Sequence, residues 1–124
     1  MNWLLVILGA MVGAPLRYVT DRAVQLRHDT VFPWGTLVVN VTGSLVLGLL
    51  TGAAAAGHAS PHLQLLIGAG LCGALTTYST FSYETLRLTE TGAGLYAAVN
   101  VVASVAAGLG AAFAGVSCAE ALWP

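Results

Sequence analysis

The sequence predicts an all-α integral membrane protein with four transmembrane helices, and three observations lead to this prediction. Of the 124 residues, 57% are hydrophobic and only 7% are charged, whereas a soluble domain is typically about 25% charged. Residues 1–16, 30–83 and 91–119 contain no Asp, Glu, Lys or Arg. Because a membrane-spanning helix needs roughly 20 mostly apolar residues, the middle stretch is long enough for two helices and each outer stretch for one. We therefore expect a single membrane domain.

Proline, tryptophan and glycine residues between or at the ends of these stretches indicate where the predicted helices begin and end. Pro33 and Trp34 mark the start of the second helix, because proline is tolerated in a first turn and tryptophan suits the membrane interface. Pro61 starts the third helix in the same way, and Gly92 marks the turn that precedes the fourth. The predicted spans are residues 2–23, 34–55, 62–87 and 95–116.

Charge and residue types exclude two function classes. The net charge is −1 and the arginines form no block, so a nucleic-acid partner is not expected. An enzyme is not expected either, because the histidines fall in predicted loops without metal-ligand partners. No pairing of a nucleophile with a base is visible in the sequence.

The third span is unusually rich in hydroxyl groups. Six Ser or Thr residues fall within residues 76–85, shortly after Gly73. A single Ser or Thr in a helix hides its polarity by bonding the carbonyl one turn back, but a cluster of six favours a break in the third helix near the middle of the bilayer. Non-helical backbone persists at that depth only inside protein or beside a polar cavity, and broken helices direct backbone groups at ions.

Polar side chains on the second and third spans admit two interpretations each. Glu84 is costly near a membrane and is typical of a pathway or a partner contact, or it forms an interfacial pair with Arg87. Asn40 either joins two helices or offers amide donors to an anion, and Thr36 lies one turn before it. Tyr78 and Phe81 share a helix face.

Two aromatic rings on one face usually pack, but their ring edges carry partial positive charge. Beside hydroxyl and amide donors, such edges could surround a small anion without any fixed cation. The sequence alone leaves both interpretations open.

Three segments carry motifs that are similar to those of one known family. In chain order they are Gly13-Ala-Pro-Leu-Arg17-Tyr18, Gly35-Thr36-Leu-Val-Val-Asn40-Val-Thr-Gly43-Ser and Gly73-Ala-Leu-Thr76-Thr77-Tyr78-Ser79-Thr80-Phe81-Ser82. The family patterns are Gly-Ala-x-x-Arg-Tyr, Gly-Thr-Leu-x-x-Asn-x-x-Gly-Ser/Cys and Gly-Gly-Leu-Thr-Thr-Phe-Ser-Thr-Phe-Ser. The sequence therefore resembles the CrcB/Fluc fluoride channels over essentially its whole length.

The resemblance implies an antiparallel, dual-topology homodimer with two fluoride pores, each lined by both subunits. It also implies a structural sodium ion at the dimer interface, held by backbone carbonyls of the broken helix at Gly73 and Thr76, and it places Arg17 in a vestibule or a structural role. The pore residues that it implies are Asn40, Tyr78, Phe81, Thr36, Ser82, Glu84 and Ser104. Three positions depart from the family pattern: Tyr78 replaces a phenylalanine, Ala74 replaces a glycine, and Asn100 stands where some members have tyrosine.

The expected function is passive, fluoride-selective export from the cytoplasm across the inner (plasma) membrane of a prokaryote, which lowers a toxic concentration. The alternative is a small four-span multidrug exporter coupled to protons. That chemistry needs an acidic residue in mid-membrane, and Glu84, near a helix end, is the one candidate. A structural subunit without transport would not require the six hydroxyl residues of the third span.

Overall fold

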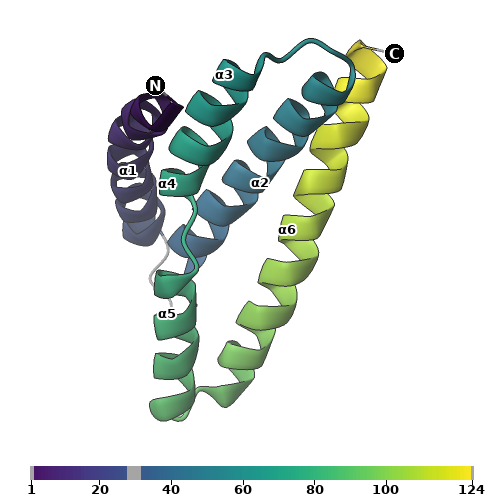
Figure 1. The fold of residues 1–124 in the computed structure, drawn as a ribbon. Coiled ribbons are helices and arrows are strands. Elements are labelled where there is room, and N and C mark those ends of the chain that lie inside the picture. Colours follow the sequence, from purple (N-terminus) through teal and green to yellow (C-terminus); the bar gives the residue numbers. More distant parts are fainter. Residues whose placement is uncertain (1, 28–31, 124) are drawn as a thin grey trace.

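The computed structural model describes residues 2–27 and 32–123, which form helices joined by short connections, with no strand in these ranges (Figure 1). The elements are α1 (Asn2–Arg27), α2 (Trp34–Ala55), α3 (Pro61–Leu63), the π-helix η1 (Gln64–Cys72), α4 (Gly73–Leu75), α5 (Ser79–Glu90) and α6 (Gly94–Leu122). When α3 through α5 are taken together, the described residues contain four helical segments long and apolar enough to cross a membrane. This confirms the predicted all-helical, four-span class.

Local sequence explains where the helices begin and end. The Ser60 hydroxyl accepts a hydrogen bond of 3.1 Å from the backbone nitrogen of Leu63, and Pro61 occupies the first helical position of α3, a common arrangement at helix starts. Gly57 follows α2 with φ of 81°, and Gly92 follows α5 with φ of 84°. Glycine adopts this left-handed conformation at low cost, so it ends helices readily.

The first, third and fourth helical segments extend past the spans predicted for them, and α5 ends at Glu90. The helix α1 continues to Arg27 and α6 to Leu122, because the residues beyond the apolar stretches include no helix breaker and a helix can project from the bilayer. The position of the membrane boundary along each helix stays a prediction.

The helix α2 packs along α6, and their backbones approach closely at small residues (Figure 1). A Cβ atom on Gly48 would lie 3.1 Å from the Cα atom of Ala112, and one on Gly115 would lie 2.7 Å from the backbone nitrogen of Leu49. Small residues at such positions let helices associate in lipid through van der Waals contact. The contact between α2 and α6 therefore forms one side of the molecule.

A second close contact joins α1 to η1. A Cβ atom on Gly9 would lie 2.9 Å from the Cα atom of Gly70 and 2.7 Å from the nitrogen of Leu71. One on Gly13 would lie 3.0 Å from the Cβ of Ala74. The helices α1 and η1 therefore form the other side of the molecule. The amino- and carboxyl-terminal ends of the described chain lie at the same end (Figure 1), as an even number of spans requires.

Large apolar side chains point outward along much of the surface. On α6 the exposed fractions are 68% for Val102, 68% for Leu109 and 75% for Phe113. A water-soluble protein rarely exposes so continuous an apolar surface, whereas lipid or a second protein covers it without cost. The surface therefore agrees with embedding in a membrane.

Candidate functional site

The helical path changes between α4 and α5. The helix α4 ends at Leu75, Thr76 has extended backbone with φ of −83° and ψ of 160°, and α5 begins at Ser79. The Thr76 hydroxyl donates to the carbonyl of Cys72 at 2.8 Å. This backbone connection lies beside α2 and forms the floor of a groove.

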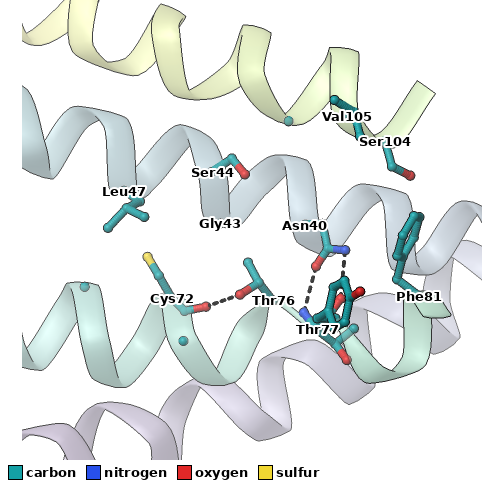
Figure 2. Close-up of a pocket in the computed structure, with 14 residues that line it drawn as sticks. Asn40, Gly43, Ser44, Leu47, Cys72, Thr76, Thr77, Phe81, Ser104 and Val105 are labelled. Atoms are coloured by element: carbon teal, nitrogen blue, oxygen red, sulfur yellow. Dashed lines mark hydrogen bonds between the residues drawn. The ribbon is translucent and has the colours of Figure 1, made fainter. Parts of the chain in front are cut away.

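The groove has a volume of about 470 Å³ and runs between α2, the connection at residues 76–78 and α6 (Figure 2). Its lining includes six of the residues that the sequence marked as functional. They are Asn40, Gly73, Thr76, Tyr78, Phe81 and Ser104. No charged side chain is among the described residues that line it, so its polar groups are neutral amides, hydroxyls and backbone groups.

Asn40 is paired with the backbone of Thr77. Its Nδ2 atom donates to the Thr77 carbonyl at 3.0 Å, and the Thr77 nitrogen donates to its Oδ1 atom at 2.7 Å (Figure 2). The amide thus satisfies one donor and one acceptor of a backbone that has left the helix. The second hydrogen on Nδ2 is not needed for this pairing. Asn40 therefore joins two elements and also lines the groove with an amide donor.

Near this pairing, the backbone carbonyls of Gly73 and Thr76 lose the hydrogen-bond donors that they would have in a continuous α-helix. In a continuous α-helix the Thr77 nitrogen would donate to the carbonyl of Gly73, but here it donates to Asn40. The Thr80 nitrogen donates to the Thr77 hydroxyl at 3.2 Å rather than to the carbonyl of Thr76. The usual helical donors of both carbonyls are therefore engaged elsewhere, and both residues line the groove.

Tyr78 and Phe81 form an aromatic pair at the groove. Their ring centroids are 6.4 Å apart with planes tilted by 40°, a common arrangement for interacting rings. The Tyr78 side chain is 80% exposed, so this ring reaches away from its own chain. The Phe81 ring points toward α2 and α6 in Figure 2.

Thr36 and Glu84 lie together outside the groove. The Thr36 hydroxyl donates to the Glu84 Oε1 atom at 2.5 Å, and Thr36 is only 3% exposed. Arg87 donates from Nη1 to the Tyr83 hydroxyl at 3.2 Å. The contact with Thr36 makes Glu84 a link between α2 and α5, and its place in a pore stays a prediction.

Ser104 belongs to a chain of hydrogen bonds between α6 and α5. Its hydroxyl donates to Asn100 Oδ1 at 3.3 Å, Asn100 Nδ2 donates to the Thr85 hydroxyl at 2.9 Å, and Thr85 donates to the Phe81 carbonyl at 2.8 Å. Asn100 is 1% exposed. The sequence marked Asn100 only as a departure from the family pattern. The feature of the sequence that could have indicated a role for Asn100 is a lone amide on an apolar helix, one turn before Ser104.

A second cavity of about 160 Å³ lies on the other side of the connection. Arg17, Asp21, Thr36, Thr77 and Thr80 are among the residues that line it. This places Arg17 beside Thr36 and away from the groove. Asp21 stands one helical turn after Arg17 and so shares its face.

Ser82 lies on α5 without lining the groove, and its place in a pore stays a prediction. Among the described residues, no cluster of three or more His, Cys, Asp or Glu could hold a metal ion. A cation in this molecule would need backbone carbonyls or hydroxyls as ligands.

Comparison with known proteins identifies close relatives over nearly the full chain. The family model described as CrcB-like protein, Camphor Resistance (CrcB), matches residues 4–116. A protein of Streptomyces avermitilis named "Fluoride-specific ion channel FluC 1" is 85% identical over 99% of both chains. A Frankia casuarinae protein of the same name is 66% identical over 99% of both chains, and a Shewanella protein named "Fluoride-specific ion channel FluC" is 50% identical over 82% of both.

Proposed function

Because this chain belongs to the CrcB family, we propose that it is a fluoride-selective ion channel through which fluoride leaves the cytoplasm passively. The observation that carries the proposal is the groove, whose described lining combines an amide, hydroxyls and aromatic rings without a charged group. The names of the relatives support fluoride as the transported ion, and they support a channel rather than an enzyme.

Neutral donors suit conduction. A fixed lysine or arginine in the groove would hold an anion strongly, and an ion that binds too strongly leaves slowly. Asn40 offers an amide hydrogen, Ser104 a hydroxyl, and the ring edges of Tyr78 and Phe81 partial positive charge. Each contact is weak by itself, so fluoride can be partly dehydrated and still released. Selectivity would follow from donors placed for a small, hard acceptor.

The groove supports a further proposal about assembly. We propose that α4 and α5 are two halves of one transmembrane helix that is interrupted at residues 76–78. We also propose that two copies associate as an antiparallel homodimer of dual topology. Tyr78 lines the groove and is 80% exposed, so a second copy that covers this residue would complete the wall. The membrane is taken to be the inner membrane of a prokaryote, since the named relatives are bacterial.

A structural sodium ion at the dimer interface is part of the same proposal. Its ligands would be the carbonyls of Gly73 and Thr76, and the residues fit this role, because the usual helical donors of these carbonyls are bonded to Asn40 and to the Thr77 hydroxyl. Carbonyl oxygens are ligands that hard cations prefer. A sodium ion bound there would supply positive charge that stabilises the carbonyls of the connection.

A proton-coupled multidrug exporter is the less favoured function. Such a protein needs a mid-membrane carboxylate that alternates between a proton and a cationic substrate. Here Glu84 accepts a hydrogen bond from buried Thr36, and the relatives carry names of fluoride channels.

The proposal is tested with purified protein in liposomes that are loaded with fluoride or chloride. Fluoride efflux down its gradient, without a proton gradient and without matching chloride efflux, is the expected result. Equal chloride flux, or no fluoride flux, would refute it.

A further inference from the structure

Asp21 occupies an unusual position on α1. A Cβ atom on Gly35, in the first turn of α2, would contact the Asp21 Oδ1 atom and would lie 2.8 Å from its Cγ atom. The absence of a side chain at Gly35 therefore lets the carboxylate lie against the start of α2. The Gly35 nitrogen donates to the Gln25 side chain at 3.3 Å, so this donor is already engaged by another residue.

The Oδ1 atom of Asp21 is buried and has no hydrogen-bond partner among the described residues. A buried carboxylate oxygen without a partner exerts its charge on its surroundings with little local compensation. Glu84, by contrast, accepts a hydrogen bond of 2.5 Å at Oε1 from the Thr36 hydroxyl. Asp21 Oδ1 thus lacks a hydrogen bond of the kind that Glu84 Oε1 accepts from Thr36.

Asp21 lines a cavity that lies close to the groove. It lines the 160 Å³ cavity together with Arg17, Thr36 and Thr77. Thr77 also lines the groove, where Asn40 pairs with its backbone. Thr77 therefore borders both the cavity and the groove. An anion that leaves the groove on the α1 side would enter the cavity that contains Arg17 and Asp21.

The two charges act on such an anion in opposite directions. The Arg17 guanidinium raises the local anion concentration, as a positive cleft does, and the Asp21 carboxylate lowers it. We propose that Asp21 sets the fluoride conduction rate of this chain by offsetting the attraction of Arg17 for anions in this cavity. The inference rests on the proposed function, since it concerns the rate of fluoride flux.

The test compares Asp21→Asn with the unchanged protein in liposomes, at about 10 mM and about 1 M of an impermeant salt. The substitution keeps the shape of the side chain and removes its charge. We expect fluoride flux to rise about two- to fivefold at low salt. At high salt, where the Debye length falls from about 30 Å to about 3 Å, the difference should become smaller, because the part of the cavity that salt reaches is screened.

Three variants separate charge from structure. Asp21→Glu keeps the charge and should leave the flux low, and Asp21→Ser should repeat the increase if Asp21→Asn fails to fold. Glu120→Gln removes a charge from the exposed end of α6 and should leave the flux unchanged.

An increase as large at high salt as at low salt, or no increase in either neutral variant, would overturn the role of Asp21. Absence of fluoride flux in the unchanged protein would instead refute the channel function itself. The two failures are therefore distinguishable.

Discussion

Asn40 on α2 and Thr77 between α4 and α5 exchange two hydrogen bonds, at 3.0 and 2.7 Å. The pair replaces helical bonds that the chain gives up when it leaves the helix at Thr76. It also fixes the floor of the groove next to the two carbonyls proposed for sodium. Stability and conduction should therefore both depend on this one side chain.

The substitution Asn40→Asp tests this dependence. A carboxylate cannot donate to the Thr77 carbonyl and carries a negative charge into the path of an anion. We expect fluoride flux in liposomes to fall at least about tenfold, and the free energy of unfolding to fall by about 1–3 kcal/mol. His62→Asp, which adds a carboxylate at an exposed position before η1, should change neither quantity. Unchanged fluoride flux in Asn40→Asp would show that Asn40 has a structural role and does not take part in conduction.

The substitution Phe81→Ile tests the aromatic pair. It keeps apolar volume but removes the ring edge that faces the groove, so fluoride flux should fall about tenfold or more while the protein stays folded. Phe113→Ile is the matched control, since that ring lies on α6, is 75% exposed and does not line the groove. Equal flux in both variants would show that the ring of Phe81 only packs.

The substitution Tyr78→Phe restores the residue of the family pattern. The Tyr78 ring is 80% exposed, so its hydroxyl adds little to the fold and we expect the melting temperature to stay unchanged. If the ring edge rather than the hydroxyl contacts the ion, fluoride flux should remain within about threefold of its original value. A loss of flux greater than tenfold would make the hydroxyl itself a ligand.

The buried amide of Asn100 connects α6 to α5. Asn100→Leu removes its bonds to Thr85 and Ser104 and should lower the free energy of unfolding by about 1–2 kcal/mol. Ser104→Ala removes a single bond of 3.3 Å and should cost less. Unfolding in detergent, measured for both single variants and the double variant, gives the coupling between them. Additive losses would contradict a shared network.

Backbone contact between α2 and α6 depends on Gly48. Gly48→Ala places a methyl group against the backbone of Ala112 and should lower both stability and flux. Gly110→Ala is the matched control, because no atom lies within 4 Å of its added Cβ. Alanine in a helix is favoured over glycine by roughly 0.5–1 kcal/mol, so that variant should be as stable as the original or more so. Equal melting temperatures for the two would count against the close contact.

The four-helix class could be predicted because a membrane leaves few choices: long apolar stretches without charge have to be helical. The lining of the groove by Asn40, Phe81 and Ser104 agrees with the predicted site residues, although their role in conduction stays a prediction. The hydrogen-bond partners of the polar side chains could not be predicted in the same way. Glu84 bonds to Thr36 across 48 positions of the chain, and spacing along one helix offered only Arg87.

The π-helix η1 and the role of Asp21 lay beyond the sequence. The backbones of α1 and η1 come close at Gly9 and Gly70, and no pattern in the sequence predicts a π-helix there. The position of Asp21 near the end of the first span does not predict its burial, which arises because Gly35 lies against it. Both features are properties of contacts between helices, which a single sequence does not display.

Three hydroxyl groups in or beside the groove already have acceptors inside the protein. Thr76 donates to a carbonyl of its own helix, Ser104 to an amide and Thr36 to a carboxylate. An anion that reaches one of them would therefore exchange places with an internal oxygen, and the total number of hydrogen bonds would stay nearly constant. Such an exchange flattens the free-energy profile along the path, because arrival brings little gain and departure little loss.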